Sequence, residues 1–300
     1  MKKVYVQIWG GLGDVALTTP VFQAFKTKYP SIKTIALCRN HRDMQLLQNN
    51  PYIDSLKLLT FFWHNWYVLL HKVGLIKIHI GNYGGLNPSY TYEKRATEII
   101  AEMMDLQLHD ANVQIYLDNE EDRTALNTLS KCRNPVIIHI TSIASRNQMW
   151  PIEKWNELVQ KMPDYTFIQL GLPNEEKVEG AIDMRGKTSV RESVGLIKHA
   201  LGFVGVVSFF AHVTNAFNKP GVVFYGPSSK SVWGHPNNIN ISKDLPCLNC
   251  IDWLSSIPCP YGKPCMELIT VQEVEAALIQ QTTSYKQPIE IRQAEFELDS

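Results

Sequence analysis

The stretch KVYVQIWGGLGDVALTTPVFQAFKTKYP, residues Lys3–Pro30, decides the fold class of this chain. Its first part, Lys3–Trp9, alternates and is rich in β-branched and aromatic residues, which predicts a strand, and the glycines that follow predict a turn. Apolar residues then recur at nearly helical spacing. Because Pro20 lies inside that pattern, we expect the helix to begin near Thr18–Thr19, with Pro20 in its first turn.

The same order of strand, small-residue turn and helix begins again at Asn134. Strands alternating with helices predict an α/β protein with parallel, doubly wound sheets. We expect two Rossmann-like domains, at residues 1–130 and 131–275, and a C-terminal helix or tail at residues 276–300. Further strands are expected within KTIALC (33–38), YTFIQLGLP (165–173), LGFVGVV (201–207) and GVVFYG (221–226), and helices within PIEKWNELVQKM (151–162), SVRESVGLIKHA (189–200) and from about Ala211.

The charge balance excludes a general nucleic-acid binder. The 300 residues hold 29 basic and 29 acidic side chains, and the pI is about 7.1. The start, MKKVYVQIWGGLGD, does not have the pattern of a signal peptide. The longest apolar stretch, Phe61–Ile80, contains three histidines and two lysines, which disfavours a membrane-spanning helix. We therefore expect a cytoplasmic protein.

The glycine loop Gly10-Gly11-Leu12-Gly13-Asp14 is a candidate site on the first domain. It lacks the third glycine of the dinucleotide-binding pattern G-x-G-x-x-G. The carboxylate of Asp14 would repel a phosphate, but an acid at the edge of a cleft suits a general base. The alternative, which the residues leave open, is that Asp14 only caps the helix.

Four loops of the second domain follow predicted strands and carry polar residues. The stretch GVVSFFAHVTNA, residues Gly205–Ala216, places Ser208 and His212 after a buried run that ends at Val207. The others are SIASRNQMW (142–150), GLPNEEK (171–177) and FYGPSSKSVWG (224–234). Hydroxyls, glycines and free helix N–H groups suit a diphosphate, and Glu175 suits sugar hydroxyls. Ordinary helix starts and a Gly-Pro turn remain alternatives.

A cysteine cluster, CLNCIDWLSSIPCPYGKPC, has the spacing C-x2-C-x8-C-x5-C. Four thiolates at such spacing suit tetrahedral zinc or an iron centre. The expected metal ligands are Cys247, Cys250, Cys259 and Cys265. We expect the metal to be structural, because four protein ligands leave no open position. The alternative is four free thiols in a loop.

Taken together and in order, these motifs resemble glycosyltransferase family 9, whose best-known members are the ADP-heptose:lipopolysaccharide heptosyltransferases. The resemblance rests on GGLGDVALTTPVFQAFKTKYP, QMWPIEKW, SFFAHVTNA, KPGVVFYGPSSKSVW and the cysteine cluster. It implies a GT-B fold, in which two Rossmann-like domains face a cleft. It also implies that the first domain binds the acceptor, that the second binds the nucleotide-sugar, and that transfer inverts the sugar without a metal.

The resemblance assigns roles to individual residues. Asp14 corresponds to the catalytic base, and the acceptor-side loop contains Gly11, Gly13 and Thr18. The donor-binding residues would be Ser142, Arg146, Gln148, Glu175, Val207, Ser208, Phe209, Phe210, His212, Gly226, Pro227 and Ser228. The aromatic stretch Leu59–Tyr90 lies where the family has its acceptor-binding elements, and it is expected to form a lid, a membrane-surface face, a partner interface or a buried helix and strand.

Two positions depart from the family pattern. Val207 stands where an aspartate is usual, and Gln148 stands where a lysine is usual. The loss of a charge-assisted contact to the donor costs about 1.5–3 kcal/mol. Arg146 or Lys230 is available as a replacement cation.

The sequence therefore predicts an inverting glycosyltransferase that transfers a heptose or related sugar from a nucleotide-sugar, ADP-heptose in the first instance. The acceptor would be the lipopolysaccharide core, another surface glycan or a protein, reached at the cytoplasmic face of the inner membrane. The alternative is a weakened family member that binds a nucleotide-sugar or partners an active transferase. A nicotinamide-dependent dehydrogenase is disfavoured by the missing third glycine.

Overall fold

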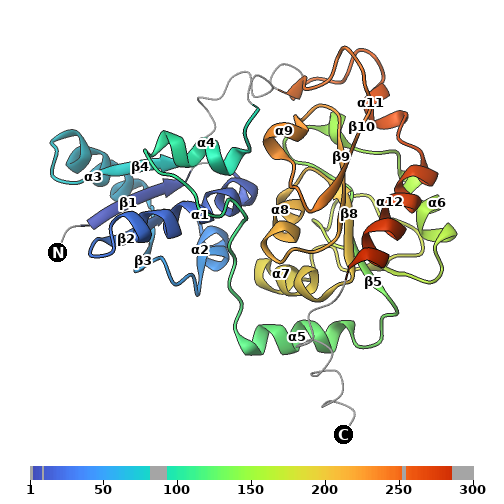
Figure 1. Cartoon of the computed structure of the whole chain (residues 1–300), viewed down its shortest axis with the longest axis horizontal. Helices are drawn as coiled ribbons and strands as arrows, with labels where there is room; N and C mark the ends of the chain where they lie inside the picture. Colours follow the sequence, from blue (N-terminus) through green and yellow to red (C-terminus); the bar gives the residue numbers. More distant parts are fainter. Residues whose placement is uncertain (1–2, 9, 82–92, 252–254, 286–300) are drawn as a thin grey trace, which may run out of the picture.

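The computed structural model describes residues 3–8, 10–81, 93–251 and 255–285, in which the strands form two separate sheets (Figure 1). The first sheet has the order β3-β2-β1-β4 and the second has the order β10-β9-β8-β5-β6-β7. All strand pairs in both sheets are parallel. The strands are β1 (Lys3–Ile8), β2 (Lys33–Cys38), β3 (Ser55–Leu58), β4 (Ile78–Gly81), β5 (Pro135–His139), β6 (Thr166–Gln169), β7 (Ile182–Asp183), β8 (Gly202–Val206), β9 (Gly221–Tyr225) and β10 (Asn238–Ser242).

The strand orders confirm the expected doubly wound α/β fold. In each sheet the chain starts in the middle and then crosses to the other side, between β1 and β4 and between β5 and β8. The central strands β8 and β9 are buried along their whole length, which explains their continuous apolar sequences. In open sheets of this kind, ligands bind beyond the carboxyl ends of the strands, where the order reverses.

The helices cover the two sheets as separate layers (Figure 1). Those before β5 are α1 (Leu12–Lys28), α2 (His41–Leu47), α3 (Phe61–Lys72), α4 (Ala96–Met103) and α5 (Asn119–Leu129). Those after it are α6 (Ile152–Lys161), α7 (Val190–His199), α8 (Phe209–Ala216), α9 (Lys230–Trp233), α11 (Pro264–Glu267) and α12 (Val271–Ser284). Helix α5 packs against α7, and α12 packs against β8, β9, β10 and α6. The expected tail beyond Tyr285 lies outside the described residues.

Helix α1 begins at Leu12, so the predicted start near Thr18 is wrong. Pro20 lies inside the helix, where it has no N–H to donate to the carbonyl of Ala16. The hydroxyl of Thr19 donates to that carbonyl at 2.6 Å instead. The side chain of Thr19 therefore supplies the bond that Pro20 lacks, and the helix continues unbroken from the glycine loop.

The structure has two lobes, the first built on the sheet β3-β2-β1-β4 and the second on the sheet β10-β9-β8-β5-β6-β7. The two lobes share one buried apolar cluster. It contains Val15 of α1 and Val213 of α8, which belong to different lobes, and α1 contacts α8 directly. Helix α2 of the first lobe likewise contacts α7 of the second. The lobes are thus packed against each other through helices, and the linker between α4 and α5 lies beside this junction (Figure 1).

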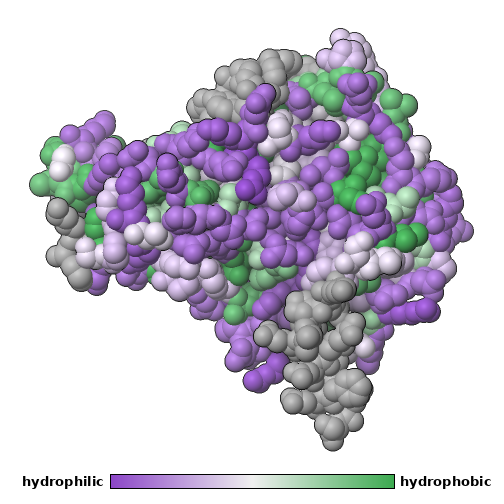
Figure 2. Space-filling model, in the orientation of Figure 1, coloured by the Kyte–Doolittle hydropathy of each residue, from purple (hydrophilic) through white to green (hydrophobic). Residues whose placement is uncertain are grey.

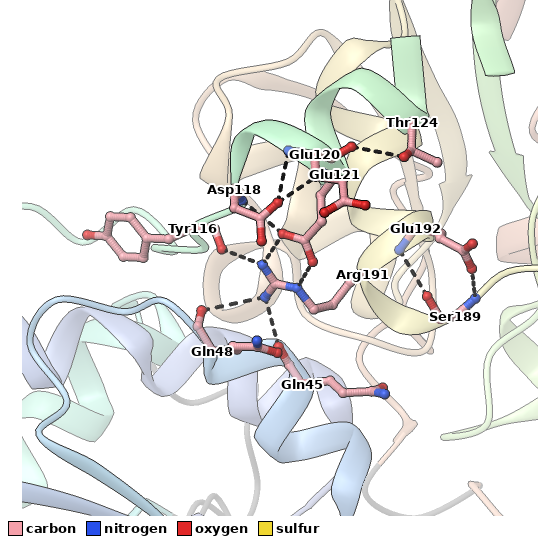
Figure 3. Close-up of polar contacts among 10 residues, drawn as sticks. All are labelled: Gln45, Gln48, Tyr116, Asp118, Glu120, Glu121, Thr124, Ser189, Arg191 and Glu192. Atoms are coloured by element: carbon pink, nitrogen blue, oxygen red, sulfur yellow. Dashed lines mark hydrogen bonds and ion pairs between the residues drawn. The ribbon is translucent and has the colours of Figure 1, made fainter. Parts of the chain in front are cut away.

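Arg191 of α7 joins both lobes and the linker (Figure 3). Its side chain is 9% exposed. The guanidinium donates to the carbonyl of Gln45 at 2.9 Å, to that of Tyr116 at 2.8 Å and to both carboxylate oxygens of Glu121. The hydrogen bonds from Arg191 hold the pKa of Glu121 below its usual range. One side chain of the second lobe therefore fixes the end of α2, the linker and α5.

Replacing Arg191 with methionine is expected to lower the free energy of unfolding by about 3 kcal/mol, because it leaves buried acceptors without their donor. Urea unfolding followed by circular dichroism measures the change. The control is Arg133→Met, which removes an exposed ion pair with Asp164 at 3.0 Å and should cost less than about 1 kcal/mol. Equal losses for the two variants would contradict the role given to Arg191.

Candidate functional site

Loops after β5, β6, β8 and β9 meet at one edge of the second sheet, because the carboxyl ends of parallel strands lie at the same edge. All four loops that the sequence singled out in this lobe are among them. The β5 and β8 loops flank the point at which the strand order reverses. The sequence-predicted donor site is therefore at the position where doubly wound sheets bind ligands.

The β8 loop leads directly into α8, which begins at Phe209, two residues before the expected start. Ser208 is the residue before the first turn, has extended backbone and makes no side-chain cap. Its hydroxyl oxygen is buried and has no hydrogen-bond partner among the described residues. Val207 is buried and belongs to the shared apolar cluster. This loop thus presents one polar group, Ser208, beside an apolar neighbour.

The glycine loop of the first lobe lies against the start of α8. A Cβ atom added to Gly13 would lie 3.3 Å from Cδ2 of His212 and 3.8 Å from Cα of Phe209. The first contact is tight and the second is an ordinary van der Waals distance, so a glycine at this position lets the two helices approach. The fold therefore brings together the candidate acceptor-side loop and the candidate donor loop, which lie about two hundred residues apart in sequence.

Asp14 lies in the first turn of α1, and its carboxylate accepts a hydrogen bond from the N–H of Gly11 at 2.6 Å. Burial raises the pKa of Asp14 above its ordinary value of 3.8, while the Gly11 N–H and the positive charge of Arg39 oppose that rise. The guanidinium of Arg39 also donates to the carbonyl of Gly10 at 2.7 Å. Asp14 is thus a helix-capping residue, and it is also a carboxylate with raised basicity.

Gly10 is required by this geometry. Its φ is +118°, and an added Cβ would lie 2.0 Å from the carboxylate of Asp14. Thr18, predicted to line the acceptor-side loop, is instead fully buried, and its hydroxyl donates to the carbonyl of Asp14 at 2.8 Å. Thr18 therefore supports the turn that holds Asp14 and does not present its side chain to the loop. Gly11, by contrast, is exposed.

His212 is a buried, neutral member of the site. Its Nδ1 lies 2.8 Å from Nε2 of His235, and burial lowers the pKa of His212 to about 4. Burial and the neighbouring His212 also lower the pKa of His235. Because both rings are neutral near pH 7, one donates and the other accepts in their hydrogen bond. His235 was not singled out in the sequence.

Gln148 joins two of the donor-site loops. Its side-chain nitrogen donates to the hydroxyl of Ser142 at 2.9 Å, and its side-chain oxygen accepts from the hydroxyl of Ser228 at 2.6 Å. The residue is 2% exposed. A lysine has no acceptor and would leave Ser228 without this bond. Where a cation was expected from the resemblance, the chain has a neutral cross-link between the β5 and β9 loops.

Aromatic and acidic groups gather at the ends of β5 and β6. The ring of Phe210 packs edge-on against His139, the last residue of β5, with the centroids 4.7 Å apart. Glu175 accepts from the N–H of Leu172 at 2.9 Å, and its second oxygen is buried without a partner among the described residues. Burial works to raise the pKa of Glu175, but the neighbouring His139 and the Leu172 N–H outweigh it and lower the pKa. The carboxylate is therefore held ionised.

His139 was not predicted as a site residue. A polar residue that ends the apolar run Val136–Ile138 was the signal that could have identified it, because such residues lie at the ligand-binding edge. Arg146, which was predicted, is exposed. Phe209 is half-buried, and its ring lies 5.3 Å from that of Phe210.

The cysteine loop packs onto the β9 loop. The carbonyl of Gly226 accepts from the N–H of Asn249 at 3.0 Å, and that of Pro227 accepts from the N–H of Ile251 at 2.9 Å. A Cβ added to Gly226 would lie 2.6 Å from Sγ of Cys265. The side chain of Asn147 adds two further bonds, to Ile257 and to Cys259. This loop therefore supports the β5 and β9 loops of the candidate donor site.

The four thiols of the loop influence one another. Burial, followed by the charges of the other three cysteines, raises the pKa of Cys265 to about 11. Burial also raises the pKa of Cys250, with contributions from Cys247 and Cys259. Within the described ranges, however, no three His, Cys, Asp or Glu side chains are grouped closely enough to hold a metal ion. The cysteines lie near one another without forming a coordination site in this arrangement.

Comparison with known families identifies the chain. The model of glycosyltransferase family 9 (heptosyltransferase) matches residues 89–259, which is more than half of the sequence. The chain belongs to glycosyltransferase family 9. As a member of this family it is a glycosyltransferase. The matched region contains all four loops of the candidate donor site but not Asp14. No curated protein matches the chain in sequence.

Solved glycosyltransferase structures have the same fold. A glycosyltransferase family 9 protein from Veillonella parvula has 15% identity and a TM-score of 0.72, over 95% of this chain and 98% of that one. ADP-heptose lps heptosyltransferase II of E. coli has 17% identity and a TM-score of 0.66, over 93% and 99%. The iron-containing dodecameric glycosyltransferase TibC of enterotoxigenic E. coli has 17% identity and a TM-score of 0.71, over 96% and 81%. These likenesses confirm the GT-B architecture.

No helix in the described part of this family 9 chain has the length and apolar content of a membrane span.

Substituting Asp14 with asparagine is expected to leave the protein at least as stable at pH 7. The folded state raises the pKa of Asp14, so it disfavours the ionised carboxylate, whereas an asparagine oxygen still accepts from Gly11. The difference should vanish below about pH 4, where the carboxyl is protonated in both states. Urea unfolding over a pH series measures it.

The matched control for this variant is Asp54→Asn. Burial works to raise the pKa of Asp54, but the bond from Lys26 at 2.5 Å and the N–H of Thr34 outweigh it and lower the pKa. Its removal should therefore destabilise the protein at pH 7, with the loss fading as the pH falls. If Asp14→Asn also destabilised the protein at pH 7, the raised basicity of Asp14 would be contradicted.

Proposed function

We propose that this family 9 glycosyltransferase transfers a heptose or a related sugar from a nucleotide-sugar to an acceptor hydroxyl, with inversion at the anomeric carbon. The observation that carries the proposal is the contact between the glycine loop and α8 at Gly13 and His212. It brings the lobe with the candidate base against the lobe with the candidate donor loops. ADP-heptose is the first donor to test, because TibC has been solved with ADP-D-beta-D-heptose and WaaC of E. coli with ADP.

Asp14 is the proposed general base. Its carboxylate accepts the proton of the acceptor hydroxyl while that oxygen attacks the anomeric carbon. The bond between the sugar and the nucleoside diphosphate breaks, and the diphosphate leaves with the electron pair. A single displacement of this kind needs one base, so no second carboxylate is required. The raised pKa of Asp14 favours proton acceptance near neutral pH.

The leaving diphosphate is proposed to lie at the start of α8. Free N–H groups of a helix N-terminus favour anions, and the unpaired hydroxyl of Ser208 adds a donor. The cross-linked hydroxyls of Ser142 and Ser228 form the adjoining wall. Arg146 or Lys230, both exposed beside these loops, supplies the cation that Gln148 does not.

Glu175 is proposed to bind the ribose of the nucleotide. Its ionised carboxylate has a buried oxygen without a partner in the described part of the chain, which suits a hydroxyl donor. Phe209 and Phe210 supply apolar contact area nearby. These residues together form the rest of the proposed donor site.

The acceptor is proposed to be the lipopolysaccharide core, another surface glycan or a protein. For the first two, the chain would work in the cytoplasm at the inner face of a membrane.

A second candidate function is a weakened family member that binds the nucleotide-sugar or partners an active transferase. Val207 and Gln148 favour it, because both are neutral where the family pattern has charges. The basic carboxylate of Asp14 and the phosphate-side loops around Ser208 and Ser228 favour the active enzyme. Calorimetry with a panel of nucleotide-sugars, followed by a nucleotide-release assay with acceptors, separates the two. Tight binding without release over a broad acceptor panel would establish the weakened member.

Replacing Asp14 with asparagine is expected to lower kcat by about 100- to 10,000-fold, the usual contribution of a general base. In the wild type, the transfer rate should rise with pH as Asp14 loses its proton, with a midpoint above 3.8. Nucleotide release at saturating donor and acceptor measures both. The control Asp164→Asn changes an exposed acid that pairs with Arg133 and should keep the wild-type rate. A folded Asp14→Asn enzyme with a near-normal rate would exclude Asp14 as the base.

A structural zinc or iron ion is proposed at the four cysteines, which would have to close around it as thiolates. The protein purified from medium with both metals should hold one ion per chain by elemental analysis. Cys250→Ser should lose the ion and lower the melting temperature, whereas Cys132→Ser, outside the cluster, should keep it. A metal-free wild type with the same melting temperature after added zinc or iron would exclude the site.

A further inference from the structure

Helix α3 carries an apolar stripe that faces solvent. Phe62, Trp66 and Leu69 recur at helical spacing, and Val73 continues the row just after the helix ends. These four residues are 69%, 47%, 50% and 58% exposed, and Leu75 is 73% exposed. We call these five residues, with the exposed Trp63, the α3 face. Figure 2 shows hydrophobic residues gathered at the end of the first lobe, where Figure 1 draws α3.

The orientation of the α3 face is fixed, because the opposite side of the helix packs against the first sheet. The ring of Tyr67 packs against Tyr5 of β1, with the centroids 5.4 Å apart. Thr60 caps the start of the helix. The stripe is thus held in place and turned outward, and contiguous exposed apolar side chains of this kind mark interaction sites.

The charged side chains of the sequence segment that carries the α3 face have one sign. No aspartate or glutamate occurs between Asp54 and Glu93, whereas the same stretch holds Lys57, Lys72 and Lys77, all exposed. The rest of the chain has balanced charge, so this asymmetry is local. Aromatic and aliphatic side chains framed by lysines are typical of surfaces that lie in the interface of an anionic lipid bilayer.

A recess continues the α3 face. It has a volume of about 670 Å³, and its walls include Leu75, Ile76, Tyr29, Lys77 and Lys3. Its one acidic wall residue, Asp105, pairs with Lys28 at 3.1 Å. The rest of the lining repeats the combination of apolar and basic side chains. An anionic lipid headgroup in this recess would lie near the ammonium groups of Lys3 and Lys77 and near apolar side chains.

The position of α3 leaves the candidate active site free. The helix lies at the end of the first lobe that is farthest from the second lobe (Figure 1). A planar partner at that end does not cover the junction of α1 and α8. A symmetric pairing of two copies through this face would place lysines against lysines, which is unfavourable.

We propose that the α3 face, with Lys72 and Lys77, docks the protein on an anionic phospholipid surface. This deepens the proposed function, on which it rests for its purpose, since a membrane-anchored glycan would be reached from that surface. Docking itself is measured without donor or acceptor. A failure of docking therefore leaves the transfer reaction standing, and a failure of transfer leaves docking standing.

The test is co-sedimentation of the full chain with vesicles of phosphatidylcholine alone or with added phosphatidylglycerol. The wild type should bind the anionic vesicles, release them at high salt and bind the neutral vesicles weakly. Phe62→Ser/Trp66→Ser should weaken binding at least tenfold, by loss of apolar burial. Lys72→Glu/Lys77→Glu should weaken it on the order of a hundredfold, because each lysine changes to a repelled charge.

Matched controls change residues of the same kind elsewhere. Leu268→Ser/Ile279→Ser removes two exposed apolar side chains of the second lobe. Lys131→Glu/Lys177→Glu reverses the charge of two exposed lysines, Lys177 in the second lobe and Lys131 just before its first strand. Both should bind like the wild type, and circular dichroism verifies that every variant is folded. Equal binding by all variants, or no wild-type binding at low salt, overturns the proposal. Self-association in sedimentation velocity that only Phe62→Ser/Trp66→Ser abolishes, without vesicle binding, overturns it in favour of a second copy.

Discussion

The arrangement of the two sheets depends on the guanidinium of Arg191. Its donors are divided between the end of α2, the linker at Tyr116 and the carboxylate of Glu121 on α5. The acceptors belong to different segments, so these bonds fix α7 relative to α2, the linker and α5. In the same packing of the two lobes, Gly13 lies against His212. The geometry of the candidate active site is therefore supported by a contact made outside it.

The sequence predicted most of the fold because the strands are buried on both faces. KTIALC was predicted as a strand and forms β2 over the same residues, and GVVFYG contains β9. The start of α1 could not be predicted, because a local rule for Pro20 was overruled by a side-chain bond from Thr19. Helix α8 starts at Phe209 because Ser208 ends the extended segment after β8, which the apolar run alone does not reveal.

The candidate site was predictable residue by residue but not as a set of contacts. Ser142, Gln148 and Ser228 were each singled out, yet the amide that joins them connects positions 80 residues apart. Arg191 resembled any surface arginine of an amphipathic helix, because its acceptors are backbone carbonyls and a carboxylate that lie 70 or more residues away in sequence. The histidine pair could not be predicted for the same reason, because nothing in the sequence indicates that His235 lies beside His212.

Thr19 has a consequence for how the two walls of the candidate site are connected. Its hydroxyl donates to Ala16 within α1 and accepts from the N–H of Gln114 on the linker at 2.8 Å. The nearby linker residues Asn112 and Val113 bond to the side chain of Asn215 on α8, at 3.0 and 2.8 Å. The helix that carries Asp14 and the helix that follows Ser208 are therefore tied to the same short segment. The two candidate walls of the site are thus coupled through the linker, in addition to their direct contact.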